Sequence, residues 1–126
     1  MQTLIYTRDD KEYERLRDAL TEISGQAEVR RDPLDGHGHY SEGYDLIIVA
    51  LDGARGMNEV SEWAGRYPSS GIIWITDDKE FAGVAMQKHI NDLIVRPYDD
   101  ERIRESISFF LSKCRDCYTW HIPASR

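Results

Sequence analysis

Two histidines and two aspartates lie close together in the segment 32–43. His37 and His39 flank a single glycine, and Asp32 and Asp35 precede them. Imidazole nitrogens and carboxylate oxygens are common ligands of transition metals. The segment offers no third ligand at the spacing that such sites usually show. The sequence therefore favours an ordinary polar loop, with a transition-metal site as the alternative.

Cys114 and Cys117 are separated by two residues, which is the spacing of redox-active dithiols and of half a zinc site. They stand at the end of the last expected helix, whereas a thioredoxin-like pair follows a first strand. One such pair supplies only two of the four ligands of a structural zinc ion. We interpret both residues as ordinary thiols. The chain also contains no glycine-rich phosphate loop and no catalytic triad in a recognisable order.

Three aspartates follow stretches that are typical of strands. Asp9 and Asp10 come shortly after residues 3–7, and Asp52 comes directly after the apolar residues 46–51. A short apolar run without a polar face is typical of a strand that is covered on both sides in a parallel sheet. The chemistry of an open α/β sheet usually lies where such strands end. Two other roles remain open, because Asp9 or Asp10 could cap a helix and Asp52 could begin a turn.

Stretches rich in β-formers alternate with stretches of helical period along the chain. This alternation predicts an α/β fold with a five-stranded parallel sheet and helices on both faces. The segment 32–43 has a proline, three glycines and no helical period, so the helix between the second and third strands should be short or absent. We expect strands over residues 3–7, 27–31, 45–51, 71–76 and 92–95, and helices over residues 11–24, 57–67, 81–90 and 99–114.

Length and composition limit the function classes. A chain of 126 residues is typical of one domain, which we place at residues 1–114, followed by a C-terminal tail over 115–126. The net charge of −7 opposes a nucleic-acid-binding surface. No apolar run approaches the roughly 18 residues of a membrane span, and the first ten residues do not resemble a signal peptide. We expect a cytoplasmic protein without nucleic-acid or membrane partners.

The order of the elements and three short segments resemble the receiver domain of two-component response regulators. The segments are Tyr44-Asp45 before an apolar strand, Ile-Ile-Trp-Ile-Thr at 72–76, and Asn-Asp-Leu-Ile-Val-Arg-Pro at 91–97. The last segment is similar to the family's pattern of an apolar strand followed by Lys-Pro and an aromatic residue. The resemblance extends over residues 2 to about 114. It implies a flavodoxin-like fold with strand order 2-1-3-4-5.

The resemblance also implies where a phosphorylation site would lie. In that family an acidic pair after the first strand binds Mg²⁺, and an aspartate ending the third strand accepts a phosphoryl group, whose charge the cation neutralises. A Thr or Ser and a Lys, ending the fourth and fifth strands, hold the phosphoryl oxygens. By position, the acidic pair falls on Thr7 and Arg8, and the acceptor falls on Ala50. Thr76 is retained, and the lysine becomes Arg96, which differs in shape.

A methyl group cannot be phosphorylated, so this pattern predicts a degenerate phosphorylation site. We expect signal transduction through phosphorylation-independent contact with another signalling protein or with a second copy of the chain. We expect no enzymatic activity, no metal and no cofactor. In the family a proline follows the fifth strand, and the peptide bond before it is typically cis. We therefore expect a cis bond between residues 96 and 97. The residues of the degenerate site are Ala50, Asp52, Thr76, Arg96 and Pro97.

Two other functions are kept as alternatives. The first is a working phosphoacceptor at Asp52, which lies two residues beyond Ala50 and would share its face if the strand continued. It would use Mg²⁺ and a residual acidic pocket containing Asp9 and Asp10. The second is a small flavodoxin-like enzyme or nucleotide-binding protein.

The last helix, the fifth strand and the tail form the output surface in receivers, and the resemblance implies the same surface here. Without a phosphoacceptor this surface should stay in one arrangement and bind constitutively. We predict contacts through Leu93, Tyr98, Tyr118 and Trp120. Trp63 and Trp74 are in phase with core residues, and the charged run from Glu12 to Asp18 is interpreted as the solvated face of the first helix.

Overall fold

Five parallel strands form the central sheet of the computed structural model, which describes residues 1–36, 40–81 and 90–117. The strand order is β2-β1-β3-β4-β5, with every neighbouring pair parallel. This confirms the predicted α/β fold and strand order. The strands are β1 (Gln2–Thr7), β2 (Glu28–Arg31), β3 (Leu46–Ala50), β4 (Gly71–Thr76) and β5 (Asp92–Val95).

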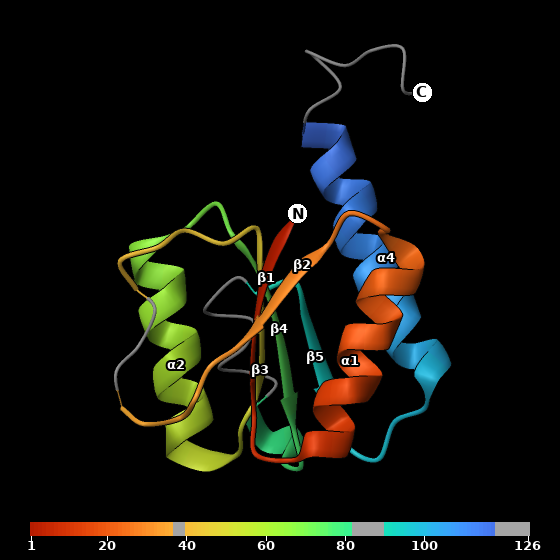
Figure 1. Ribbon diagram of the computed structural model, residues 1–126. Coiled ribbons are helices and arrows are strands. Elements are labelled where there is room, and N and C mark those ends of the chain that lie inside the picture. Colours follow the sequence, from red (N-terminus) through yellow and green to blue (C-terminus); the bar gives the residue numbers. More distant parts are fainter. Residues whose placement is uncertain (37–39, 82–89, 118–126) are drawn as a thin grey trace.

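Helices cover both faces of the sheet (Figure 1). The helices α1 (Asp10–Ile23) and α4 (Asp100–Cys117) pack side by side on one face, and α2 (Gly53–Arg66) covers the other. A short 3₁₀ helix, η1 (Lys79–Phe81), follows β4. The helix expected over residues 81–90 falls almost entirely outside the described residues. Helix α2 begins four residues earlier than the sequence predicts, and α4 continues three residues past Cys114.

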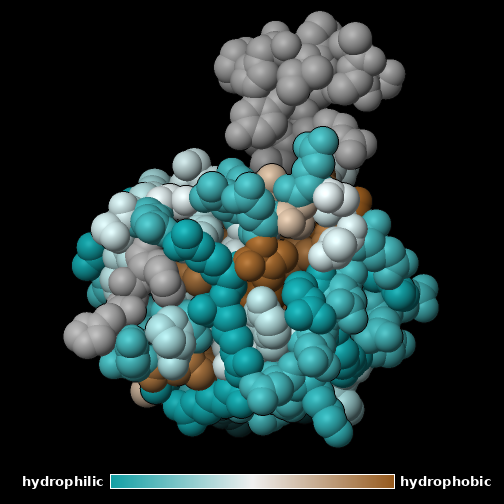
Figure 2. Space-filling view, in the orientation of Figure 1, coloured by the Kyte–Doolittle hydropathy of each residue, from teal (hydrophilic) through white to brown (hydrophobic). Residues whose placement is uncertain are grey.

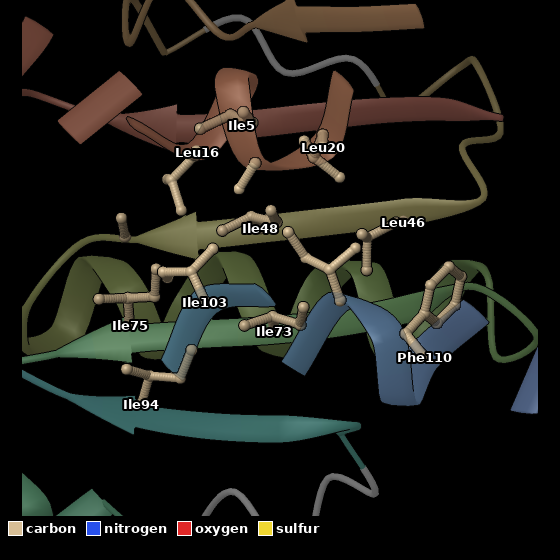
Figure 3. Close-up of a cluster of buried hydrophobic side chains, with 13 residues drawn as sticks. Ile5, Leu16, Leu20, Leu46, Ile48, Ile73, Ile75, Ile94, Ile103 and Phe110 are labelled. Carbon is tan, nitrogen blue, oxygen red and sulfur yellow. The ribbon is translucent and has the colours of Figure 1, made fainter. Parts of the chain in front are cut away.

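Two apolar clusters separate the sheet from its helices. Because side chains alternate across a strand, successive residues of β3 belong to different clusters. All five residues of β3 are buried, as the apolar run predicts. The cluster beneath α1 and α4 is drawn in Figure 3 and includes Ile5, Leu16, Leu20, Ile48, Ile73, Ile107 and Phe110. The cluster beneath α2 includes Leu4, Tyr6, Ile47, Val49, Trp63 and Trp74.

The segment between β2 and β3 contains no helix in its described parts, residues 32–36 and 40–45. Aromatic side chains attach this segment to α2. The ring centroids of Tyr40 and Tyr44 lie 5.1 and 5.8 Å from that of Trp63, and the ring centroid of Tyr67, at the C-terminal end of α2, lies 5.4 Å from it. The fully buried indole of Trp63 donates a hydrogen bond to the Tyr6 hydroxyl at 2.9 Å. Trp63 therefore joins the segment, α2 and the sheet, which confirms its core position.

The face shown in Figure 2 is mostly hydrophilic, with a limited hydrophobic area near its centre. The large hydrophobic side chains that are exposed among the described residues are Val95 and Phe109, at 36% and 54% exposure. Both belong to the part of the molecule formed by β5 and α4. Within the described residues, no helix combines the length and apolarity that a membrane crossing requires.

Candidate functional site

A small cavity of about 200 Å³ lies at the edge of the sheet where the strands end. Parallel strands bring their carboxyl ends to one edge, so residues that are distant in sequence meet there. Side chains from the ends of β1, β3, β4 and β5 and from the start of α1 surround the cavity. Its lining residues are Thr7, Arg8, Asp9, Glu12, Ala50, Leu51, Asp52, Asp77 and Arg96.

The guanidinium group of Arg96 stands at the centre of this cavity's polar contacts. Its Nε and Nη2 atoms donate to the two carboxylate oxygens of Glu12 at 3.1 and 2.9 Å. Its Nη1 atom donates to Asp52 at 3.2 Å and lies 3.7 Å from Asp77. Nη2 also donates to the carbonyl oxygen of Ala50 at 3.3 Å. One cation therefore contacts three carboxylates and a backbone carbonyl.

Glu12 is the carboxylate most withdrawn from water, with 7% of the residue exposed. It also accepts hydrogen bonds from the hydroxyl groups of Thr7 at 2.8 Å and Tyr98 at 2.6 Å. The interpretation of the charged run in α1 as a solvated face is wrong at this residue. Glu12, Leu16 and Leu20 are spaced by four residues and lie on the same buried face of the helix. That spacing is the signal in the sequence that could have identified Glu12.

Asp52 occupies the N-cap position of α2, but its carboxylate makes no capping hydrogen bond. It accepts hydrogen bonds instead from the Thr76 hydroxyl at 3.0 Å and from the backbone N–H of Asp77 at 2.7 Å. The carboxylate is thereby directed toward Arg96 and the ends of β4 and β5. Half of the Asp52 side chain remains exposed. The structure thus brings together Ala50, Asp52, Thr76 and Arg96, as the resemblance implies.

The site's charges are fixed by these contacts. Burial raises the pKa of the Glu12 carboxyl, but hydrogen bonds from Arg96, Tyr98 and Thr7 outweigh burial and bring the pKa below its ordinary value. Burial opposes ionisation of Asp52 as well, yet the N–H of Asp77, the Thr76 hydroxyl and the charge of Arg96 lower its pKa. Burial lowers the pKa of Arg96, and Glu12 more than reverses that effect. The network is therefore ionised at neutral pH.

The other predicted acidic residues are placed differently. Asp9 caps α1 by accepting hydrogen bonds from the backbone N–H groups of Lys11 and Glu12, and it also lines the cavity. Asp10 does not line the cavity; it forms an ion pair with Arg31 at 2.7 Å. Helix capping by Asp9 is thus confirmed, and Asp10 belongs to the outer surface. Asp77, which directly follows β4, also lines the cavity and is a residue of the site that was not predicted from the sequence.

The predicted contact residues are divided between described and undescribed parts of the chain. Leu93 packs against the cluster beneath α2. Tyr98 packs against the cluster beneath α1 and α4, and its hydroxyl donates a hydrogen bond to Glu12. Tyr118 and Trp120 lie outside the described residues, as do His37 and His39. Cys114 and Cys117 lie in the last turns of α4, where the side chains are not described.

The bond between Arg96 and Pro97 is cis, which confirms the prediction made from the resemblance. With Arg96 bonded to its carboxylates, the cavity of the native protein does not suit Mg²⁺. Thr7 and Arg8 replace the acidic pair, and the oxygens of Glu12 are already bonded to protein groups. In the described part of the chain, no three His, Cys, Asp or Glu side chains are grouped to hold a metal ion.

Comparisons with solved structures establish the class of fold, which is that of response-regulator receiver domains. The receiver domain of AraT, a response regulator from Geobacillus stearothermophilus, aligns with a TM-score of 0.75 and 22% identity, over 91% of this chain and 95% of its own. The response regulatory domain of MrkE from Klebsiella pneumoniae aligns with a TM-score of 0.72 and 23% identity, over 92% and 99% of the two chains.

The response regulator DrrB from Thermotoga maritima aligns with a TM-score of 0.74 and 14% identity. The alignment extends over 89% of this chain but only 52% of DrrB, so the chain spans about half of that protein's length. No protein-family model and no curated protein sequence matches the chain. The resemblance seen in the sequence is therefore confirmed at the level of the fold.

Proposed function

We propose that this receiver-like domain transmits a signal by contact with another signalling protein or with a second copy of itself, without phosphorylation and without a cofactor. The observation on which this proposal rests is Ala50. Its side chain is 4% exposed and belongs to the apolar cluster beneath α1 and α4, at the end of the strand where the family's acceptor aspartate stands. A methyl group at this position supplies no nucleophile.

The charges of the cavity support the proposal. A phosphoryl group entering it would meet the carboxylates of Glu12, Asp52 and Asp77. Arg96 is already hydrogen-bonded to the first two and lies 3.7 Å from the third. Like charges at such distances repel, and Arg96 is already paired with these carboxylates, so the exposed Arg8 is the cation of the lining that would face the repulsion. Two features therefore support the proposal: residue 50 supplies no nucleophile, and the guanidinium of Arg96 is already paired with carboxylates.

A second function is favoured by the geometry of Asp52. Its half-exposed carboxylate accepts hydrogen bonds from the hydroxyl of Thr76 and the guanidinium of Arg96. These correspond to the two groups that hold phosphoryl oxygens in the family. Under this alternative, Asp52 is a shifted phosphoacceptor. Its lowered pKa keeps it ionised, as an attacking carboxylate must be.

Intact-mass spectrometry after incubation with acetyl phosphate and Mg²⁺ tests the two functions against each other. We expect no added phosphoryl group in the native protein. An added mass that is lost in Asp52→Ala and retained in Asp10→Ala would refute the proposal and establish the alternative. Asp10 is the matched control because its carboxylate lies at the same end of the sheet but outside the cavity.

The contact surface that we propose is the part of the molecule formed by β5 and α4. Val95 is exposed on β5 and Phe109 on α4, and Leu93, two residues before Val95, is partly buried. Light scattering over a range of concentrations separates the two kinds of partner. A dimer that Val95→Glu dissociates would support self-association through this surface, whereas a monomer at all concentrations would leave only a different protein as partner.

A further inference from the structure

The acceptors around Arg96 are the oxygen types that hard divalent cations prefer. They are the carboxylates of Glu12, Asp52 and Asp77 and the backbone carbonyl of Ala50, at distances of 2.9 to 3.7 Å from the guanidinium nitrogens. Protein sites for Ca²⁺ and Mg²⁺ are built from carboxylates and carbonyls of this kind. Here the cation inside the oxygen set is a side chain of the protein.

The shape of arginine suits this position better than that of lysine. The planar guanidinium places Nε and Nη2 against both oxygens of Glu12, while Nη1 remains available for Asp52 on the opposite side. An ammonium group is a single point of charge and cannot make this two-sided, bidentate contact. Only 23% of the Arg96 side chain is exposed, so its charge is largely directed into the cavity.

The contacts continue from the cavity into the connection between β5 and α4. Glu12 accepts a hydrogen bond from the Tyr98 hydroxyl, so the carboxylate that binds the guanidinium of Arg96 also fixes this aromatic ring. Arg15, one turn further along α1, lies 4.9 Å from the centre of the Tyr98 ring and donates to the carbonyl of Tyr98 and to Asp100. Helix α1 therefore holds the segment 96–100 at both ends.

We infer that Arg96 is the resident cation of this pocket: its guanidinium takes the place of a divalent metal ion and holds the segment 96–100 in one arrangement without metal or phosphoryl group. This inference concerns the source of the positive charge. It stands independently of whether a partner binds and of the phosphorylation experiment above. It also assigns Arg96 a positioning role, exercised through Glu12 on Tyr98.

Thermal unfolding with and without millimolar Mg²⁺ tests the inference on the native protein and on Arg96→Met. The native melting temperature should not respond to Mg²⁺. Arg96→Met should unfold at a lower temperature, because three carboxylates lose their counter-ion, and Mg²⁺ should restore part of the loss. The restoring shift should be about 5 °C when Mg²⁺ is present at about ten times its dissociation constant.

Arg102→Met is the matched control, because Arg102, in the first turn of α4, forms a comparable ion pair with Asp92 of β5 outside the cavity. It should lose stability without gaining any response to Mg²⁺. Hydrogen exchange gives a second readout: residues 96–100 should exchange faster in Arg96→Met than in Arg102→Met, and Mg²⁺ should slow them again only in the former.

Three results would overturn the inference. They are a native protein stabilised by Mg²⁺, with the effect lost in Asp52→Asn; an Arg96→Met variant that Mg²⁺ does not stabilise; and exchange in residues 96–100 that is unchanged by the substitution. If Arg96→Met does not fold, the double variant Glu12→Gln/Arg96→Met decides the question. It should fold, because the most buried carboxylate no longer needs a counter-ion, and failure of this variant to fold would also overturn the inference.

Discussion

The substitution Glu12→Gln tests the ionic network most directly, because it preserves the shape of the side chain and removes only its charge. The Glu12 carboxylate accepts four hydrogen bonds, two from Arg96 and one each from Thr7 and Tyr98. The amide of glutamine would turn a donor toward groups that are themselves donors. The guanidinium of Arg96 would keep Asp52 but lose its best-buried partner.

The expected loss of stability follows from this geometry. Breaking a fully buried ion pair by removing one partner costs about 3–5 kcal/mol. Arg96 is partly exposed and retains Asp52, so we expect Glu12→Gln to lower the free energy of unfolding by about 2–3 kcal/mol. For a domain of this size that corresponds to a fall in melting temperature of about 6–12 °C. Glu14→Gln, on the exposed face of the same helix, should change stability by less than about 0.5 kcal/mol.

The loss should also depend on pH in a defined direction. The pKa of Glu12 is lowered by folding, so the unfolded chain binds this proton more readily. The stabilisation is therefore complete above the unfolded pKa of about 4.3 and disappears as the pH falls through the lower pKa of the folded state. Asp52, whose pKa is lowered as well, is present in both proteins, so its contribution cancels to first order.

Urea unfolding followed by circular dichroism measures both effects, at neutral pH and at about pH 3. The difference between the native protein and Glu12→Gln should be large at neutral pH and smaller in acid. The reasoning is refuted if the two proteins are equally stable at neutral pH, or if the difference increases as the pH falls.

Two further predictions concern how α2 is attached to the sheet. A Cβ atom at Gly56 would lie 2.0 Å from the carbonyl oxygen of Leu51, so Gly56→Ala should destabilise the protein by about 3 kcal/mol or more. A Cβ atom at Gly65 would meet nothing within 4 Å, so Gly65→Ala should stabilise the same helix by up to about 1 kcal/mol. A melting temperature of Gly56→Ala at or above that of Gly65→Ala would contradict this. Trp63→Phe removes the buried hydrogen bond to the Tyr6 hydroxyl and should cost about 1–3 kcal/mol in urea unfolding, and a native-like midpoint would show that the bond contributes nothing.

The fold could be predicted because its signals are local. Each buried strand appears as a short apolar run, and the helices show apolar residues at helical spacing, so element types followed from neighbouring residues. The absence of a helix in the described parts of the segment between β2 and β3 could be predicted for the same reason, from the proline and the three glycines of residues 32–43. The start of α2 was placed too late because residues 53–56 contain two glycines and an arginine and give no apolar signal.

The site could be predicted only in part, because its contacts join residues that are distant in sequence. Arg96 and Asp52 were identified by their places at strand ends. Glu12 was missed, since a charged residue in a charged run looks solvated, although it is separated from its partner Arg96 by 84 residues and lies beside it in the fold. The spacing to Leu16 places Glu12 on the buried face. The sequence does not show that Arg96 lies beside it, and a buried carboxylate without a compensating partner is unfavourable.

Ala50 and Arg96 are the two departures from the receiver pattern that fit each other. The carbonyl oxygen of Ala50 accepts a hydrogen bond from Nη2 of Arg96, while the methyl group of Ala50 packs into the apolar cluster beneath α1 and α4. A carboxylate in that position would place a fourth negative charge around one guanidinium, which Glu12 and Asp52 already engage from both sides. Arginine cannot release its charge by losing a proton, because these carboxylates raise a pKa that is already high. A small apolar side chain at residue 50 therefore adds no further negative charge to a pocket in which carboxylates already outnumber cations. The same arrangement that removes the nucleophile keeps the cation in place.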